Sequence, residues 1–211
     1  GGVWMFASIL TSVVIVASLW AQEPPSFLTQ NELKHAPGWV RQLSSLLLYG
    51  DDGSIVQELP LHNADPVGTN INETIGGASP DARLAWTLER HTVWNPSRTK
   101  ILQSRRLLKV IGTSGQELWQ DDSVNNPERG EPIQFSSDGK TILLARHPET
   151  GWFAEIRNWM GQPLFVLGPY PKLISMTLTP NGRYALVRWG VQDKSDTHTF
   201  VDVLAKNSKD I

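Results

Sequence analysis

A short polar turn recurs along this chain, each time directly before an apolar run, and this recurrence restricts the fold more than any other feature. The segments are "ASPDARLAWTL", "FSSDGKTILLA" and "LTPNGRYALVRW", which begin at Ala78, Phe135 and Leu178. In each segment a small residue or proline precedes Asp or Asn, and a basic residue follows two positions later. Aligning Asp81, Asp138 and Asn181 gives spacings of 57 and 43 residues, which predicts a repeat architecture.

A second class of turn alternates with the first and places glycine between two strand-like runs. These turns contain Gly53, Gly115 and Gly161, and a fourth turn is predicted near Asn207. Gly and Asn accept the positive φ that tight hairpins require, while the flanking apolar residues favour strands. Four short strands per unit and a period of about 40 to 45 residues are typical of a β-propeller blade. Coincidental hairpins of a β-sandwich are the alternative.

The polar turns also have a local physical explanation. The Asp or Asn side chain can accept a hydrogen bond from the backbone two residues on, and the next residue takes the turn conformation. The apolar run that follows, such as residues 141–145, alternates only weakly, so we expect a strand that neighbouring blades cover on both faces. The recurring stretch is therefore interpreted as structural and not as a catalytic loop.

The quoted motifs "SPDARLAW", "SSDGKTILLA" and "TPNGRYALV" resemble the blade-opening motif of TolB-like, WD-repeat-like propellers. Similar repeats occur in the propeller domains of prolyl oligopeptidase-type peptidases. The resemblance extends over residues 43–211 and departs from the pattern at Ala82, which stands in place of the usual glycine. It implies an all-β fold, namely a partial or small β-propeller of four-stranded antiparallel blades. About three and a half units are present, so either other strands complete the ring or the chain is part of a longer protein.

The second unit is longer than the third by about eleven residues, which fall within "RHTVWNPSRTKILQSRR". Loops of a propeller lie on its rims, where ligands bind. The mixed basic and aromatic residues of this insertion are therefore a candidate partner-binding surface, namely Arg90, His91, Trp94 and Arg98. The alternatives are that the tryptophans fill gaps between blades and that "QSRRLLK" is the solvated start of a strand.

The amino terminus carries an uncharged segment from Val3 to Ala21, followed by the polar stretch "QEPPSFLTQ". This pattern predicts one hydrophobic helix, residues 1–21, acting as a signal peptide or a membrane anchor. Residues 22–42 would form a linker leading into the repeats of residues 43–211. We therefore expect an exported protein, periplasmic or extracellular, that contacts the membrane only if Val3 to Ala21 is retained.

Several chemistries are excluded by residue content. The chain has no cysteine, and its 19 basic and 21 acidic residues give a net charge of -2, so neither thiolate sites nor a nucleic-acid partner is expected. The five histidines have no metal-ligand spacing, and no nucleophile elbow or phosphate-binding loop occurs. The acidic pairs Asp51-Asp52 and Asp121-Asp122 lack the spacing of a calcium loop. We therefore predict no catalytic residue, no metal and no cofactor.

These observations favour an exported, non-catalytic β-propeller module that binds or scaffolds another protein at the cell envelope. The alternative is the propeller portion of a larger prolyl oligopeptidase-type hydrolase whose catalytic domain is absent from this chain. A lyase or glycosidase that acts at a central channel is a third possibility, and it would need polar residues that converge at one end of the inner strands.

Overall fold

The computed structural model describes residues 37–190 and 196–211, which form sixteen strands in four antiparallel sheets. The first sheet contains β1 (Gly38–Arg41), β2 (Ser45–Tyr49) and β3 (Ile55–Pro60). The second contains β4 (His62–Val67), β5 (Asn70–Ala78), β6 (Ala85–Trp94), β7 (Ile101–Ile111) and β8 (Glu117–Asp121). The third contains β9 (Ile133–Phe135), β10 (Thr141–Arg146), β11 (Trp152–Asn158) and β12 (Pro163–Tyr170). The fourth contains β13 (Lys172–Leu178), β14 (Tyr184–Gly190), β15 (Thr197–Asp202) and β16 (Asn207–Asp210).

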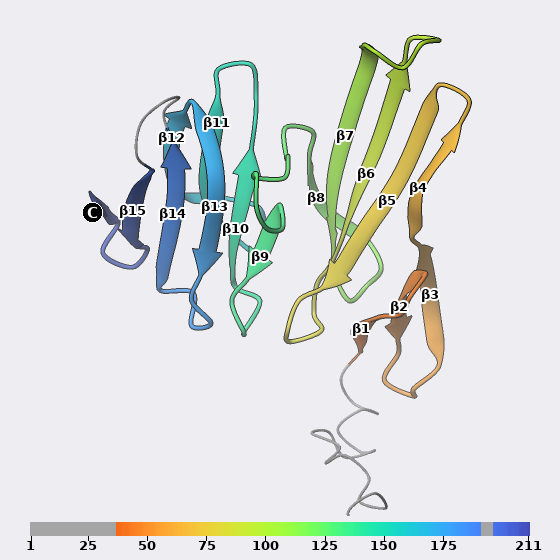
Figure 1. The fold of residues 1–211 in the computed structure, drawn as a ribbon. Coiled ribbons are helices and arrows are strands. Elements are labelled where there is room, and N and C mark those ends of the chain that lie inside the picture. The colour runs from red at the N-terminus through yellow and green to blue at the C-terminus, as the bar shows by residue number, and fades with distance from the viewer. Residues whose placement is uncertain (1–36, 191–195) are drawn as a thin grey trace, which may run out of the picture.

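The four sheets follow one another in space in the same order as in the sequence, with the first and fourth at opposite ends of the row (Figure 1). One apolar core lies at each of the three joints between neighbouring sheets. Successive antiparallel sheets of about four strands, stacked face to face, are the blade arrangement of a propeller. The predicted all-β, propeller-like architecture is confirmed, although the first sheet has three strands and the second has five.

Strand β10 illustrates why the apolar runs alternate so weakly. Leu143 and Ala145 belong to the core shared with the fourth sheet, whereas Ile142 and Leu144 belong to the core shared with the second. All four side chains are fully buried. Because a strand points successive side chains to opposite faces, burial of both faces demands an unbroken apolar run. The prediction that neighbouring blades cover both faces of this strand is confirmed.

The opening turns of the last three sheets share one hydrogen-bond pattern. In the third sheet the Asp138 carboxylate accepts hydrogen bonds from the Ser136 hydroxyl (2.7 Å) and the Lys140 amide (3.1 Å). The Ser136 oxygen in turn accepts one from the amide of Thr141, at 3.0 Å. Equivalent bonds are made by Ser79 with Asp81 and by Thr179 with Asn181. The predicted side-chain-to-backbone bond is confirmed, and a hydroxyl that the sequence interpretation did not consider completes it.

The second class of turn lies where the alternation predicted it. Gly53, Gly115 and Gly161 have φ of 78°, 76° and 82° and join the last two strands of the first three sheets. The fourth turn, predicted near Asn207, is also confirmed. Its positive φ of 52° falls on Lys206, and Asn207 is the first residue of β16.

The insertion in the second unit lengthens two strands and adds no separate loop. Strands β6 and β7 have ten and eleven residues, and their hairpin extends beyond the body of the second sheet (Figure 1). "QSRRLLK" lies near the start of β7 as expected, although its Leu108 is fully buried. Additional length is accommodated as strand because β5 and β6 pair in register over the whole of β5.

The predicted signal peptide or anchor, residues 1–21, and most of the predicted linker fall outside the described residues. Strand β1 begins at Gly38, inside the range assigned to the linker, since Trp39 packs into the core at the first joint. In the part of the chain that the structure describes, no helix is long and apolar enough to cross a membrane.

Replacing Ala82 by glycine is expected to stabilise the fold. Ala82 has φ of 61°, while the equivalent Gly139 and Gly182 have 67° and 69°. The left-handed conformation strains a residue with a Cβ, and relief of this strain minus the entropy that glycine adds to the unfolded chain leaves about 0.5 kcal/mol. Urea unfolding followed by tryptophan fluorescence measures this gain in the free energy of unfolding.

The matched control is Gly139→Ala, which should have the opposite effect. A Cβ at Gly139 would lie 2.7 Å from the Asp81 carboxylate, in addition to the strained φ. We expect a loss of at least about 1 kcal/mol. Destabilisation by Ala82→Gly would contradict the interpretation of this turn.

Candidate functional site

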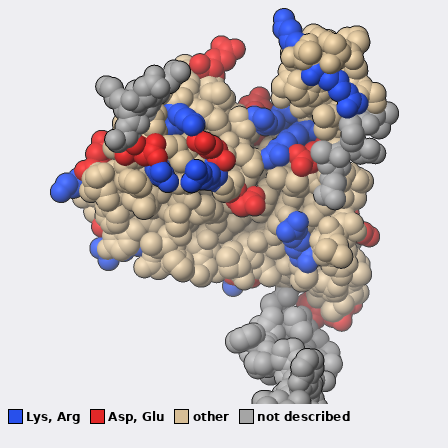
Figure 2. Space-filling view, in the orientation of Figure 1, with Lys and Arg blue, Asp and Glu red and all other residues tan. Residues whose placement is uncertain are grey.

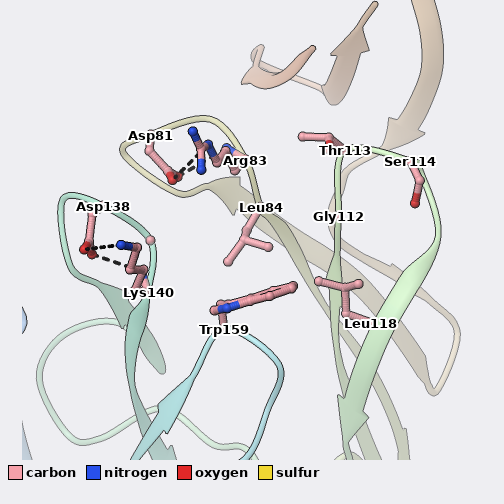
Figure 3. A pocket seen from close by; sticks show the side chains of 11 residues that line it. Asp81, Arg83, Leu84, Gly112, Thr113, Ser114, Leu118, Asp138, Lys140 and Trp159 are labelled. Carbon is pink, nitrogen blue, oxygen red and sulfur yellow. Dashed lines mark hydrogen bonds and ion pairs between the residues drawn. The ribbon is translucent and has the colours of Figure 1, made fainter. Parts of the chain in front are cut away.

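A cleft of about 370 Å³ lies between the second and third sheets, at the end of the fold where their opening turns meet. Its apolar lining comes from Leu84, Leu118 and Trp159. Figure 3 shows the flat ring of Trp159 below Leu84 and directed toward Leu118, with the backbone of residues 112–114 on the Leu118 side. The cleft therefore combines an exposed aromatic surface with aliphatic walls.

Charged residues of two opening turns form the rim of the cleft. Asp81 and Arg83 come from the β5–β6 turn, and Asp138 and Lys140 from the β9–β10 turn (Figure 3). The ion pairs within each turn are long, 3.9 Å and 4.0 Å, and the Arg83 and Lys140 side chains are 77% and 73% exposed. Such pairs contribute little to stability, so both cations can engage a partner.

Two close approaches hold the walls of the cleft together. Trp119 Nε1 on β8 donates a hydrogen bond to the Trp159 carbonyl at 3.0 Å, which joins the second sheet to the third. Gly161 permits this approach, because a Cβ there would lie 2.6 Å from the Trp119 ring. The Arg157 guanidinium also lies over the Trp119 ring, 5.2 Å from its centre. Trp119 thus fills the gap between two sheets, as the alternative interpretation of the tryptophans predicted.

A second hollow of about 820 Å³ continues the cleft toward the first sheet. The two hollows share the same four charged residues, Asp81, Arg83, Asp138 and Lys140. The second hollow adds Pro37, Val40 and Tyr49 to the lining. Together they form a groove across three sheets with apolar walls and a charged middle.

The two carboxylates of this groove, Asp81 and Asp138, accept hydrogen bonds from residues of their own turns. The pKa of Asp138 is lowered by the hydrogen bonds from the Ser136 hydroxyl and the Lys140 amide, so the group is ionised at neutral pH and unsuited to act as a general acid. The described histidines lie apart, on β4, on β6, after β10 and on β15. Among the residues that the structure describes, no three potential metal ligands come together.

A buried charge cluster joins the second and third sheets. Asp121 at the end of β8 accepts hydrogen bonds from Ser123 and pairs with Arg157 (2.6 Å) and Arg146 (3.3 Å). Glu155 pairs with both arginines, at 2.8 Å in the case of Arg157. Each charge has an opposite partner, so the cluster is structural, and the Asp121 carboxylate is not left available for calcium.

The four residues predicted as a partner surface are distributed over the long hairpin. Arg90, His91 and Trp94 lie on β6, where alternation sends Arg90 and His91 to opposite faces, and Arg98 lies in the β6–β7 turn. Arg90 pairs with Glu73 at 2.8 Å and donates to Asn126. The Arg98 guanidinium donates to the Gly68 carbonyl. The structure does not bring the four side chains together into one cluster.

The sequence predicts only a structural role for the opening turns that line the groove. The opening turns do carry that role, yet they also place one acid and one base each at the same end of neighbouring sheets. The repeated basic residue two positions after Asp or Asn was the available signal. The position of Trp159 beside these turns requires the three-dimensional stacking of the sheets.

Comparison with known proteins yields solved structures of low similarity. No family model matches the chain, and no curated protein matches it significantly. The chain is similar to the β-propeller domain of the trilobed protease from Pyrococcus furiosus, with 11% identity, 60% of this chain and 39% of that one covered, and a TM-score of 0.42. It is also similar to TolB from Acinetobacter baumannii, with 11% identity, 82% of this chain and 51% of that one covered, and a TM-score of 0.34. A putative dipeptidyl aminopeptidase IV from Bacteroides ovatus has 10% identity and a TM-score of 0.41, and the match covers 82% of this chain and 34% of that one.

The chain spans less than two thirds of the length of each of these structures. The propeller-like fold rests on the four stacked sheets described above.

The charge cluster predicts a defined acid sensitivity. Burial alone would raise the pKa of Asp121. The hydrogen bonds that Ser123 donates and the charges of Arg146 and Arg157 together hold this pKa below the usual 3.8. A carboxylate with a lowered folded-state pKa contributes stability above its unfolded pKa, and this contribution is lost as the pH falls through the folded value. Asp121→Asn should therefore lower the free energy of unfolding by about 2 kcal/mol at pH 7.

Urea unfolding of both proteins between pH 7 and pH 2.5 measures the difference. We expect it to be constant above pH 5 and to shrink as the pH falls from the unfolded-state pKa through the lower pKa that Asp121 has in the folded protein. A difference that does not change with pH would contradict the assignment of this carboxylate.

Proposed function

We propose that this chain is a non-catalytic propeller module of the TolB-like kind that binds an extended segment of another protein in the groove between the first three sheets. The observation that carries the proposal is the cleft in which the exposed Trp159 ring lies beside Leu84 and Leu118. Tryptophan is enriched among the residues that dominate binding energies at protein interfaces. Apolar walls with a few placed charges suit a peptide.

The rim supports a peptide over a small neutral ligand. Arg83 and Lys140 can pair with acidic side chains of a partner, and Asp81 and Asp138 can pair with basic ones. The two adjoining hollows, of about 370 and 820 Å³, give the groove room for several residues of a peptide. The preference among partner sequences would then come from the order of charges along the segment.

A non-catalytic role is supported by how the ionisable groups are used. Asp81 and Asp138 accept hydrogen bonds within their own turns, and Asp121 and Glu155 are neutralised by arginines. General acid or base catalysis needs a group that is free to exchange a proton with a substrate. None of these four carboxylates meets that need.

The proposal is tested by selecting binders for the full chain from a display library of random twelve-residue peptides. The affinity of a selected peptide is then measured for Trp159→Ala, which should weaken binding at least tenfold because the aromatic wall is lost. Trp159 is 44% exposed, so the substitution should leave the fold intact. Trp94→Ala is the control, since Trp94 lies at the far end of β6.

Retained affinity in Trp159→Ala, or an equal loss in Trp94→Ala, would overturn the assignment of the groove. Peptide selection of this kind also separates the groove from the hairpin surface of Arg90, His91, Trp94 and Arg98, because the two variants report on different ends of the molecule.

We propose in addition that the module is exported, as the uncharged segment Val3 to Ala21 suggests. Fusion of residues 1–42 to an alkaline phosphatase that lacks its own signal should give active enzyme in the bacterial periplasm, because that enzyme needs disulfides to fold. The intact mass of the exported fusion distinguishes a cleaved signal from a retained anchor. Phosphatase activity no higher than that of an unfused control would contradict export.

A further inference from the structure

Strand β7 has an unpaired edge along its first seven residues. Strand β6 pairs with β7 from Ile101 to Ile111, whereas β8 pairs only with the part from Leu108 to Ile111. Among the described residues, none forms a backbone hydrogen bond with the outer edge of residues 101–107. Free N–H and C=O groups along such an edge are a template for another strand.

The edge is accessible and long enough for one added strand. Residues 101–105 are exposed, and the apolar side chains of Ile101 and Leu102 are 46% and 61% exposed. Seven residues span about 23 Å at the usual rise of a strand, which is the length of a typical strand in a sheet. The hairpin that carries the edge extends beyond the body of its sheet, so a partner can approach it (Figure 1).

The hairpin that carries this edge is strongly basic, which favours an acidic partner. Between Arg90 and Gln116 the chain has no acidic residue but six basic ones, namely Arg90, Arg98, Lys100, Arg105, Arg106 and Lys109. Arg90 pairs with Glu73 and Lys109 with Glu89, which leaves four of the six without an acidic partner among the described residues. Lys and Arg are visible at the tip and along the side of this hairpin in Figure 2.

Two neighbouring arginines reinforce this preference. Arg106 lies directly opposite Arg90 in the register of β6 and β7, and of the two only Arg90 pairs with a carboxylate, that of Glu73. Burial and the charge of Arg90 lower the pKa of Arg106. The buried Nε of Arg90 has no hydrogen-bond acceptor in the described part of the chain. An added carboxylate would relieve the repulsion between the two cations.

We propose that the outer edge of β7, residues 101–107, binds an extended acidic segment of a partner protein as an additional β-strand. Main-chain hydrogen bonds would supply the pairing, and Arg105, Arg106 and Lys100 would select for acidic side chains. A second copy of this chain does not fit, because pairing two β7 edges would bring arginines opposite arginines. This surface is separate from the groove, which lies at the other end of the second sheet.

The test uses the full chain and two fluorescein-labelled nonapeptides, one of alternating valine and glutamate and one of alternating valine and lysine. Fluorescence polarisation should show binding of the glutamate peptide only, and the affinity should fall as salt is added. Hydrogen exchange of residues 101–107 should slow on binding, because free edge amides become hydrogen-bonded. Equal affinities for the two peptides, or unchanged exchange in residues 101–107, would overturn the proposal.

Charge-reversal variants locate the site. Arg105→Glu should weaken binding of the glutamate peptide about tenfold, because one attraction is replaced by one repulsion. Arg41→Glu is the matched control, since Arg41 is exposed on β1 and the net charge changes equally. Trp159→Ala should leave this affinity unchanged, which separates the edge from the groove. The proposal would be overturned if the full chain bound single-stranded DNA or anionic vesicles more tightly than it binds the glutamate peptide.

Discussion

Burial of both faces of the middle strands is the constraint on which the rest of this structure depends. Leu143 and Leu144 lie in different cores, yet both are fully buried, because a sheet packs on each side of β10. A sheet of four short strands cannot hide two apolar faces from water by itself. Each sheet therefore needs its neighbours. Polar side chains that can bind a partner are confined to the turns, the strand edges and the ends of the row of sheets.

Polar contacts across the joints then fix how the sheets sit against one another. Trp39 Nε1 donates to the Gly112 carbonyl at the first joint, and the Asp121 cluster with Trp119 ties the second. At the third, the Gln134 side chain donates to the Met176 carbonyl and accepts from the Leu178 amide. Apolar burial has no direction, whereas these bonds do, so they hold the turns of adjacent sheets in the positions that form the groove.

The local turn chemistry was predictable from the sequence, whereas the gathering of distant residues was not. The hydrogen bonds of Asp81, Asp138 and Asn181 depend on residues within two positions, so they follow directly from the motif. The meeting of Trp159 with Leu84 depends on the stacking of two sheets, for which a single sequence carries no signal. The extra residues of the second unit were recognised, but length alone does not distinguish a loop from an extended hairpin.

The topology places the two proposed surfaces at opposite ends of the second sheet. The β5–β6 and β7–β8 turns line the groove, while the β6–β7 turn reverses the chain at the far end, beside the free edge (Figure 1). The groove carries charges of both signs, whereas the edge is basic and exposes backbone groups. Because neither surface shares a residue with the other, two partner segments could bind at once. Linking both segments in one partner would raise the affinity through effective concentration, with no new contact required.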